Sequence, residues 1–267
     1  MTAPLHPCAL LGPDDPEPVA LAGEPLAPGP LVLLGDHAGR LFPRRLGDMG
    51  LAAGDRHRHI TLDLGTEPLG RLLSQRLTAP FVSQTYSRLV ADCNRAPDSV
   101  GAMPPVSDGT AIPANGALTP AGRAERLRAI HEPYHRAIAA LLNARADAGL
   151  PSVVVALHSF TPALAGAERR VWNAGVLHGG PGDAYGRRVL RLLQQRPEGW
   201  VIGDNQPYSF GATDYTIARH AIPRALPWLE LEVRQDHLAT PAGIAAVADR
   251  LAPLLVEALA ALAPAPA

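Results

Sequence analysis

The feature that most constrains the fold is an apolar run, rich in β-branched side chains, between Pro151 and Pro162. A run of this length is short for a helix and is typical of a strand buried on both faces. It places His158 at the carboxyl end of that strand. Because ligands bind at the carboxyl ends of strands in open α/β sheets, His158 is a candidate functional residue.

Two further apolar runs have the same character. The first, over residues 30–39, carries His37 into a glycine turn. The second, over residues 226–236, alternates in period two and places Glu232 and Arg234 on the same face. Two histidines and a carboxylate on three strands indicate one metal site.

Length and patterning favour one large domain. At 267 residues the chain can bury a sizeable core, and we expect a domain over residues 30–267. Residues 1–29 are rich in proline and acidic residues, which predicts an extended arm, either lying on the body or loose. Helical patterns alternate with the strand-like runs, so the predicted fold class is a three-layer α/β domain.

The patterns also give approximate element boundaries. The predicted helices cover residues 55–77, 119–148, 185–195 and 241–262, with glycine and proline near residues 65–70 expected to break the first. The predicted strands cover residues 31–36, 81–82, 89–93, 151–162, 176–177, 200–203 and 226–236. Thr119 is the expected N-cap of the second helix. His59 and Asp63 are four apart on the first helix, so both should point to one face.

Charge and cysteine content exclude several classes of protein. The formal net charge is −1 and the charges are dispersed, so neither a nucleic-acid stripe nor a polybasic membrane patch is expected. All 24 basic residues are arginine, which excludes a Schiff-base or phosphate-loop lysine. Cys8 and Cys93 lack metal or redox spacing, and no signal peptide or apolar run of ~20 residues is visible. We therefore predict a soluble, cytoplasmic protein.

The candidate metal site needs a third ligand. His59 and Asp63 are both available, and the pattern does not choose between them. Neutral imidazoles with a carboxylate suit zinc, which in catalytic sites keeps a fourth position for water. The alternative is that His37 and His158 are packed, hydrogen-bonded residues and Asp63 is solvated.

Six short motifs fall in order along the chain, over residues 36–40, 58–65, 86–95, 157–162, 203–209 and 231–236. Together they resemble the N-formylglutamate amidohydrolase family, which is similar to zinc carboxypeptidases and aminoacylases. The resemblance implies a central mixed sheet in a phosphorylase/hydrolase-like fold. It also implies zinc-dependent hydrolysis of a small N-acyl amino acid such as N-formylglutamate.

The resemblance assigns roles by position. His37 and His158 match the histidines that such enzymes place on zinc. Zinc carboxypeptidases have a glutamate ligand three residues after the first histidine, whereas this chain has Arg40 there. The third ligand must come from elsewhere, and His59 or Asp63 is the nearest source.

The substrate contacts follow in the same way. The Asn94-Arg95 pair resembles the one that holds the α-carboxylate in zinc carboxypeptidases, and the planar fork of arginine suits a carboxylate. Arg88 is a candidate for a side-chain carboxylate, the ordinary alternative for such arginines being surface ion pairs. Asn205 and Tyr208 are expected on a substrate-facing loop, with an ordinary proline turn as the alternative.

Glu232 matches the glutamate that moves protons in carboxypeptidase-like enzymes, with Glu230 as the competing candidate. A non-catalytic relative that binds a carboxylate ligand or a partner is the alternative function, and loss of the metal residues would favour it. His37, His158 and Glu232 are all present, which favours an enzyme. A nucleotide-binding domain is weakly supported, since no G-x-G-x-x-G follows a strand.

Overall fold

The computed structural model describes residues 9–211 and 213–262, so Cys8 lies outside the described residues. Within them, seven strands form one sheet in the order β1-β3-β2-β6-β9-β7-β8. Their bounds are β1 (Val19–Ala22), β2 (Leu31–Gly35), β3 (Phe81–Gln84), β6 (Val153–Phe160), β7 (Ala174–Leu177), β8 (Ile202–Asp204) and β9 (Trp228–Arg234). A separate two-stranded sheet joins β4 (Val106–Ser107) to β5 (Thr110–Ala111).

The main sheet is mixed, as predicted. Strands β3, β2, β6 and β9 run parallel, while β1 and β7 are antiparallel to their neighbours β3 and β9. The parallel run brings the carboxyl ends of β2, β6 and β9 to one edge of the sheet. His158 on β6 lies directly opposite Glu232 on β9 in the strand register.

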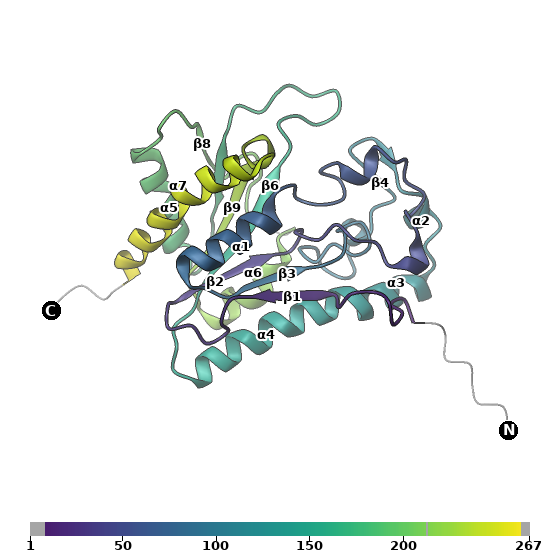
Figure 1. Cartoon of the computed structure of the whole chain (residues 1–267), viewed down its shortest axis with the longest axis horizontal. Coiled ribbons are helices and arrows are strands. Elements are labelled where there is room, and N and C mark those ends of the chain that lie inside the picture. Colours follow the sequence, from purple (N-terminus) through teal and green to yellow (C-terminus); the bar gives the residue numbers. More distant parts are fainter. Residues whose placement is uncertain (1–8, 212, 263–267) are drawn as a thin grey trace.

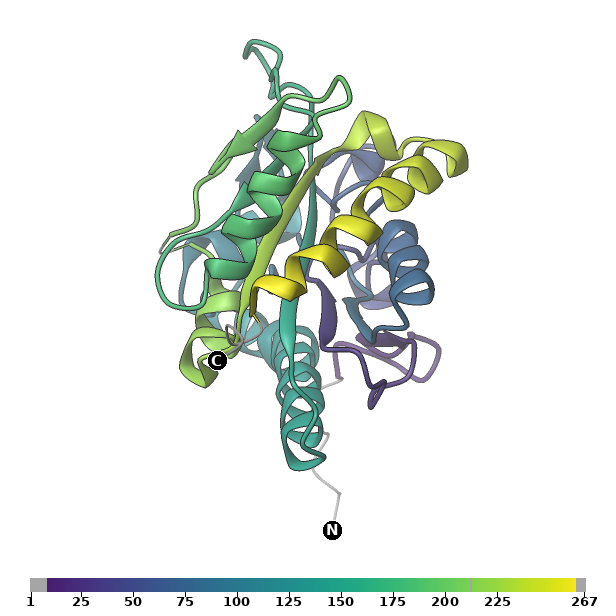
Figure 2. The same cartoon turned by 90° about the vertical axis from the view of Figure 1, so that its left-hand side faces the viewer.

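Helices cover both faces of the sheet, which confirms the predicted three-layer fold (Figure 1). One face carries α1 (Thr66–Leu77), α5 (Ala184–Gln195) and α7 (Pro241–Leu259), and the other carries α4 (Glu132–Asp147) and α6 (Tyr215–His220). Figure 2 shows α5 and α7 lying next to each other, in contact, over their face. Among the described residues, no helix has both the length and the apolar character that crossing a bilayer requires.

Alternation along the strands decides which side chains reach the site. Val153, Val155 and Leu157 of β6 join the core under α1, α5 and α7, whereas Val154 and Ala156 join the core under α4. His158 therefore belongs to the α4 side. The same alternation in β9 places Glu230 and Glu232 on the face of Trp228, the side that packs toward α4.

One predicted strand is wrong. Residues 89–93 form turns and irregular chain instead of a strand. Side chains satisfy the backbone there: Ser87 Oγ accepts the N–H of Leu89 at 3.2 Å, and Asp92 Oδ1 accepts the N–H of Asn94 at 3.0 Å. Such local bonds compete with a strand ladder.

The first predicted helix is also much shorter than expected. Only a 3₁₀ turn forms at Asp55–His57, and α1 begins at Thr66. Gly65 precedes α1 with φ of 81°, and a Cβ there would lie 2.3 Å from Leu238 Cβ. His59 and Asp63 consequently lie in turns, and the prediction that a helix aligns them is wrong.

The other predicted helices are present. Thr119 caps α3 (Pro120–Arg126) by accepting the N–H of Gly122 at 3.1 Å, as expected. The helix then continues through a π-helical segment, Leu127–His131, into α4. Between residues 96 and 119, all of which the structure describes, the regular pieces are β4, β5, the 3₁₀ turn Val100–Ala102 and α2 (Pro113–Gly116). A short 3₁₀ turn, Ala260–Leu262, extends α7.

The described part of the N-terminal arm lies on the body. Its strand β1 pairs with β3 at the edge of the sheet. Arg145 of α4 is fully buried, and its guanidinium donates to the carbonyls of Pro25, Ala27 and Gly29 at 2.6–3.1 Å. It also donates to Pro151 O at 2.8 Å, which ties the arm to the residues before β6.

Replacing Arg145 with Met should destabilise the protein by about 2–4 kcal/mol, because several buried carbonyls lose their donor at once. Urea unfolding measures the change. Arg136→Met is the matched control on the same helix, since Arg136 is exposed and pairs with Glu132 only across one turn. Its effect should stay within about 0.5 kcal/mol. Equal losses in both variants would contradict an anchoring role for Arg145.

Candidate metal site and substrate cavity

Three buried side chains converge at the edge where β2 and β6 end. The donor atoms of His37, Asp63 and His158 all lie within 4.8 Å of one another. Asp63 Oδ2 is 3.4 Å from His37 Nδ1 and 2.9 Å from His158 Nδ1. The backbone fixes this meeting, because the N–H of Asp63 donates to His37 O at 2.9 Å and the N–H of Ser159 to Asp63 Oδ2 at 3.2 Å.

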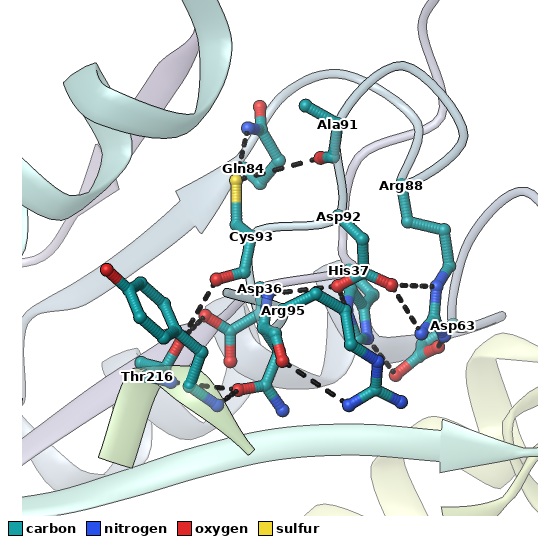
Figure 3. Close-up of polar contacts among 12 residues, drawn as sticks. Asp36, His37, Asp63, Gln84, Arg88, Ala91, Asp92, Cys93, Arg95 and Thr216 are labelled. Carbon is teal, nitrogen blue, oxygen red and sulfur yellow. Dashed lines mark hydrogen bonds and ion pairs between the residues drawn. The ribbon is translucent and has the colours of Figure 1, made fainter. Parts of the chain in front are cut away.

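The second nitrogen of each histidine faces a carboxylate. His37 Nε2 is 2.7 Å from Asp92 Oδ1, and His158 Nε2 is 3.5 Å from Asp36 Oδ2. The hydroxyl of Thr216, on α6, donates to Asp36 Oδ1 at 2.7 Å. Figure 3 shows Asp36, His37, Asp63 and Asp92 gathered in this network. The hydrogen bond to Asp92 fixes the tautomer of His37, while His158 Nε2 faces Asp36 and Glu230 without a hydrogen bond. Nδ1 of both rings is left to a shared ligand.

The donor set fits a divalent metal ion. Two imidazole nitrogens and one carboxylate oxygen, all buried, make the three-protein-ligand arrangement of catalytic zinc sites, in which a further position stays open. The cluster could therefore bind a metal. Arg40, at the position where zinc carboxypeptidases have a glutamate ligand, is exposed and lies outside the cluster.

The structure separates the two candidates for the third ligand. Asp63 is in the cluster, whereas His59 Nε2 lies 3.2 Å from Asp108 Oδ2. Arg58 also pairs with Asp108, at 2.9 Å. His59 lines the cavity next to the cluster but belongs to this neighbouring ion-pair group.

Arg88 is held inside the site by two carboxylates (Figure 3). Its Nε and Nη2 donate to Asp92 Oδ2 at 3.0 and 2.7 Å, and its Nη1 donates to Asp63 Oδ1 at 3.1 Å. Burial raises the pKa of Asp92, but the charges of Arg88 and His37 outweigh it and hold that pKa well below its usual range. Arg88 thus stabilises the ionised carboxylates that orient His37.

A cavity of about 470 Å³ opens beside the cluster. Its wall includes Arg88, Asn94, Arg95 and Tyr208 of the predicted substrate contacts. The structure does not bring Asn205 to the wall; its Oδ1 accepts the N–H groups of His178 and Phe210 within the turn.

Asn94 and Arg95 make different contacts. Asn94 Oδ1 accepts the N–H groups of Tyr215 and Thr216 at 2.9 Å and so caps the first turn of α6. Arg95 Nη1 donates to two backbone carbonyls, those of Asn94 and Thr213. Its guanidinium forms no ion pair with a described carboxylate.

Two glutamates of β9 face the cavity. Burial raises the pKa of Glu232 to about 7 and that of Glu230 to about 8. Glu230 Oε1 accepts from Asn94 Nδ2 at 3.2 Å and lies 3.3 Å from His158 Nε2. The buried Oε2 atoms of both glutamates lack a hydrogen-bond partner among the described residues, but only Glu230 has its other oxygen bonded to Asn94. Glu232 is therefore the less constrained of the two carboxylates.

Sequence reasoning missed several residues of the site. Asp36 and Asp92 both lie in the motifs described above, but neither was assigned a role. Asp92 could have been found from its position two residues before Asn94. Thr216 and the cavity-lining, buried Asp214 gave no local signal, because α6 reaches the site only through the fold.

A stack of buried histidines supports the loop that carries Asn94. His135 Nε2 donates to Cys93 O at 3.0 Å, and its Nδ1 is 2.9 Å from His220 Nε2. Carbonyls only accept, so His135 is the neutral Nε2–H tautomer and His220 donates to it. Burial lowers the pKa of His135 to about 2 and that of His220 to about 4.

Known proteins show the same architecture. The profile of one family, N-formylglutamate amidohydrolase, matches residues 29–239. The crystal structure of a gene product from Agrobacterium tumefaciens is similar at 32% sequence identity and a TM-score of 0.89, covering 95% of this chain and 99% of that one. N-formylglutamate amidohydrolase from Ralstonia eutropha is similar at 22% identity and a TM-score of 0.66, covering 90% and 96%. No curated protein matches the chain.

Single replacements test the metal cluster. Asp63→Ala should lose the metal, as should His37→Ala and His158→Ala, because each removes one of three donors. His59→Ala should retain it, since His59 pairs with Asp108. Elemental analysis of the purified variants measures the metal content. If His59→Ala lost the metal and Asp63→Ala kept it in full, His59 and not Asp63 would be the third ligand.

Stability should fall in acid because of the histidine stack. The folded-state pKa of His135 lies below the unfolded value of about 6.5, so the unfolded chain takes up the proton first. The stabilisation is complete above pH ~6.5 and declines below it, by about 1.4 kcal/mol per pH unit for each such histidine. Chemical unfolding between pH 7 and 4 should show a shallower slope in His135→Gln. The exposed His57→Gln should keep the wild-type slope, and an unchanged slope in both variants would contradict this account.

Proposed function

The chain belongs to the N-formylglutamate amidohydrolase family and is an amidohydrolase, and from that premise we propose that it hydrolyses a small N-acyl amino acid with the help of zinc. The products would be the free amino acid and a carboxylic acid. N-formylglutamate is the substrate that the family name suggests. The observation that carries the proposal is the buried His37–Asp63–His158 cluster next to the unconstrained carboxylate of Glu232.

Zinc held by His37, Asp63 and His158 would act as a Lewis acid that polarises the acyl carbonyl and acidifies water. Asp92 keeps the imidazole of His37 in the required tautomer by a hydrogen bond, and the charge of Asp36 faces that of His158 at 3.5 Å. With zinc bound, these five side chains would hold its positive charge at the wall of the cavity, where the acyl oxygen gains negative charge during hydrolysis.

Glu232 is the proposed general base. It accepts a proton from the attacking water and returns it to the nitrogen of the leaving amine, so that the C–N bond breaks without a charged amide anion. Its raised pKa, about 7, suits both transfers at neutral pH. Glu230 is bonded to Asn94 and lies close to His158, so it positions these groups and is the weaker candidate.

Arg95 is the proposed anchor for the α-carboxylate of the substrate. It lines the cavity, and its Nε and Nη2 donate to no described residue. That edge of the guanidinium can take a carboxylate with two parallel hydrogen bonds. Asn94 holds the chain on which Arg95 stands, and Tyr208 closes the wall of the cavity.

A cytoplasmic location is part of the proposal. The buried thiol of Cys93 is free, which is the usual state of cysteine in a reducing compartment.

The direct test is amine release by zinc-loaded protein from a panel of N-formyl and N-acetyl amino acids. Release from at least one member supports the proposal. Absence of release from every member, in protein shown to contain zinc, would refute it.

Glu232→Gln should reduce kcat by roughly 10²–10⁴-fold, the usual effect of removing a general base, while the zinc content stays unchanged. Glu230→Gln is the matched control two residues earlier on the same strand and should lose much less activity. Steady-state kinetics with elemental analysis of both variants decides the matter. If Glu230→Gln abolishes turnover and Glu232→Gln does not, the base is Glu230.

A further inference from the structure

A second hollow lies outside the substrate cavity. It has a volume of about 570 Å³ and shares no lining residue with the cavity beside the metal cluster. Its wall comes from the chain between β2 and α1, namely residues 40–42, 47, 56–57, 62 and 64. We call it the Arg40–Leu64 groove. Hollows of this size that combine an apolar lining with a few polar groups commonly hold small molecules.

The floor of the groove is apolar. Four of its side chains are hydrocarbon and none of them is fully buried: Leu41, Phe42, Leu62 and Leu64. The backbone of Leu41 is fixed, because its N–H donates to Thr85 O at 3.3 Å and its carbonyl accepts the N–H of Ser87 at 2.8 Å. Apolar side chains that gather in a surface hollow are typical of a binding site for an apolar group.

The groove also carries positive charge without a protein counter-charge. Arg40, Arg56 and His57 line it. Among the described residues, none forms an ion pair or a side-chain hydrogen bond with these three. The Nε of Arg56 is even buried without a hydrogen-bond partner. A buried donor without an acceptor costs free energy, so this N–H is available to a ligand.

The acidic side chains of the same segment are engaged elsewhere. Asp48 Oδ1 accepts the N–H of Gly50 at 2.9 Å, and Asp55 Oδ1 accepts from Arg58 Nη1 at 2.8 Å. Asp63 belongs to the metal cluster. None of the described residues that line the groove is acidic. An apolar floor beside uncompensated guanidinium groups matches a ligand that is apolar and carries an anionic group.

We propose that the Arg40–Leu64 groove binds a small organic anion, an alkyl or aryl body with one carboxylate, at a place separate from the substrate cavity. The carboxylate would meet Arg40 and Arg56, and the apolar body would lie on the four side chains of the floor. Binding there does not require the proposed function. Leu62 and Leu64 flank Asp63, so the occupant would touch the two chain neighbours of a residue of the metal cluster.

The test compares two fluorescent probes, anilinonaphthalene sulfonate and phenylnaphthylamine, which share a ring system and differ by the anionic group. Full-length protein should bind the sulfonate saturably and the neutral dye more weakly. Arg56→Gln and Arg40→Gln should each weaken binding of the sulfonate roughly tenfold, as expected for a lost charge-assisted contact, and leave the neutral dye unchanged. Leu41→Ser should weaken both dyes, because they share the floor.

Arg44→Gln is the matched control. Arg44 is exposed in the same segment, pairs with Asp14 and does not line the groove, so this variant should bind both dyes like the wild type. Thermal unfolding of each variant comes first, because partly folded protein also binds the sulfonate. If Arg56→Gln is unstable, Arg40→Gln still decides, since Arg40 is exposed and its replacement removes no internal contact.

Four outcomes would overturn the proposal. The first is the absence of saturable binding of the sulfonate, and the second is equal affinity of the wild-type protein for both dyes. If Arg95→Gln abolishes binding of the sulfonate and Arg56→Gln does not, the dye occupies the substrate cavity. Self-association of the wild-type protein in analytical ultracentrifugation that Leu41→Ser removes would assign the groove to a second copy of the chain.

Discussion

The site depends on the compensation of charge that the fold has removed from water. Isolated ionised carboxylates are costly to bury, so each one near the cluster needs a cation or several donors. Asp92 meets Arg88 and His37, and Asp63 meets Arg88 and both metal-site histidines. Arg88 is the common partner of the two carboxylates. A divalent cation at the cluster would add positive charge next to the remaining acidic groups, Glu232 among them.

Regular and irregular chain contribute different parts of this arrangement. Strands β2, β6 and β9 deliver His37, His158 and Glu232 to one edge, because parallel strands end together. The polar partners come from loops, which can turn carboxylates and amides inward without breaking a ladder. The loop that carries Asp92 and Asn94 is fixed in place because His135, which stacks on His220, donates a hydrogen bond to the carbonyl of Cys93.

The strand residues of the site were predictable for a physical reason. A strand buried on both faces must be a continuous apolar run, and the polar residue that ends such a run stands out without any knowledge of its neighbours. His37 and His158 were found in this way, and Glu232 was found from the period-two alternation of the third run. The three-layer α/β fold followed from the alternation of runs and helical patterns. Asp63 was named only as one of two options, because an apolar spacing that looked helical concealed the turn that Gly65 imposes.

The sequence by itself determined the fold class, the strand ends and the chemical types that meet there, because local periodicity encodes burial. It also excluded lysine chemistry. Tertiary structure alone decided that Asp63 and not His59 joins the cluster, and that Arg88 forms ion pairs with Asp63 and Asp92. Those outcomes depend on which charges come within about 4 Å across long chain separations, and pairings of that kind leave no periodic trace in the sequence.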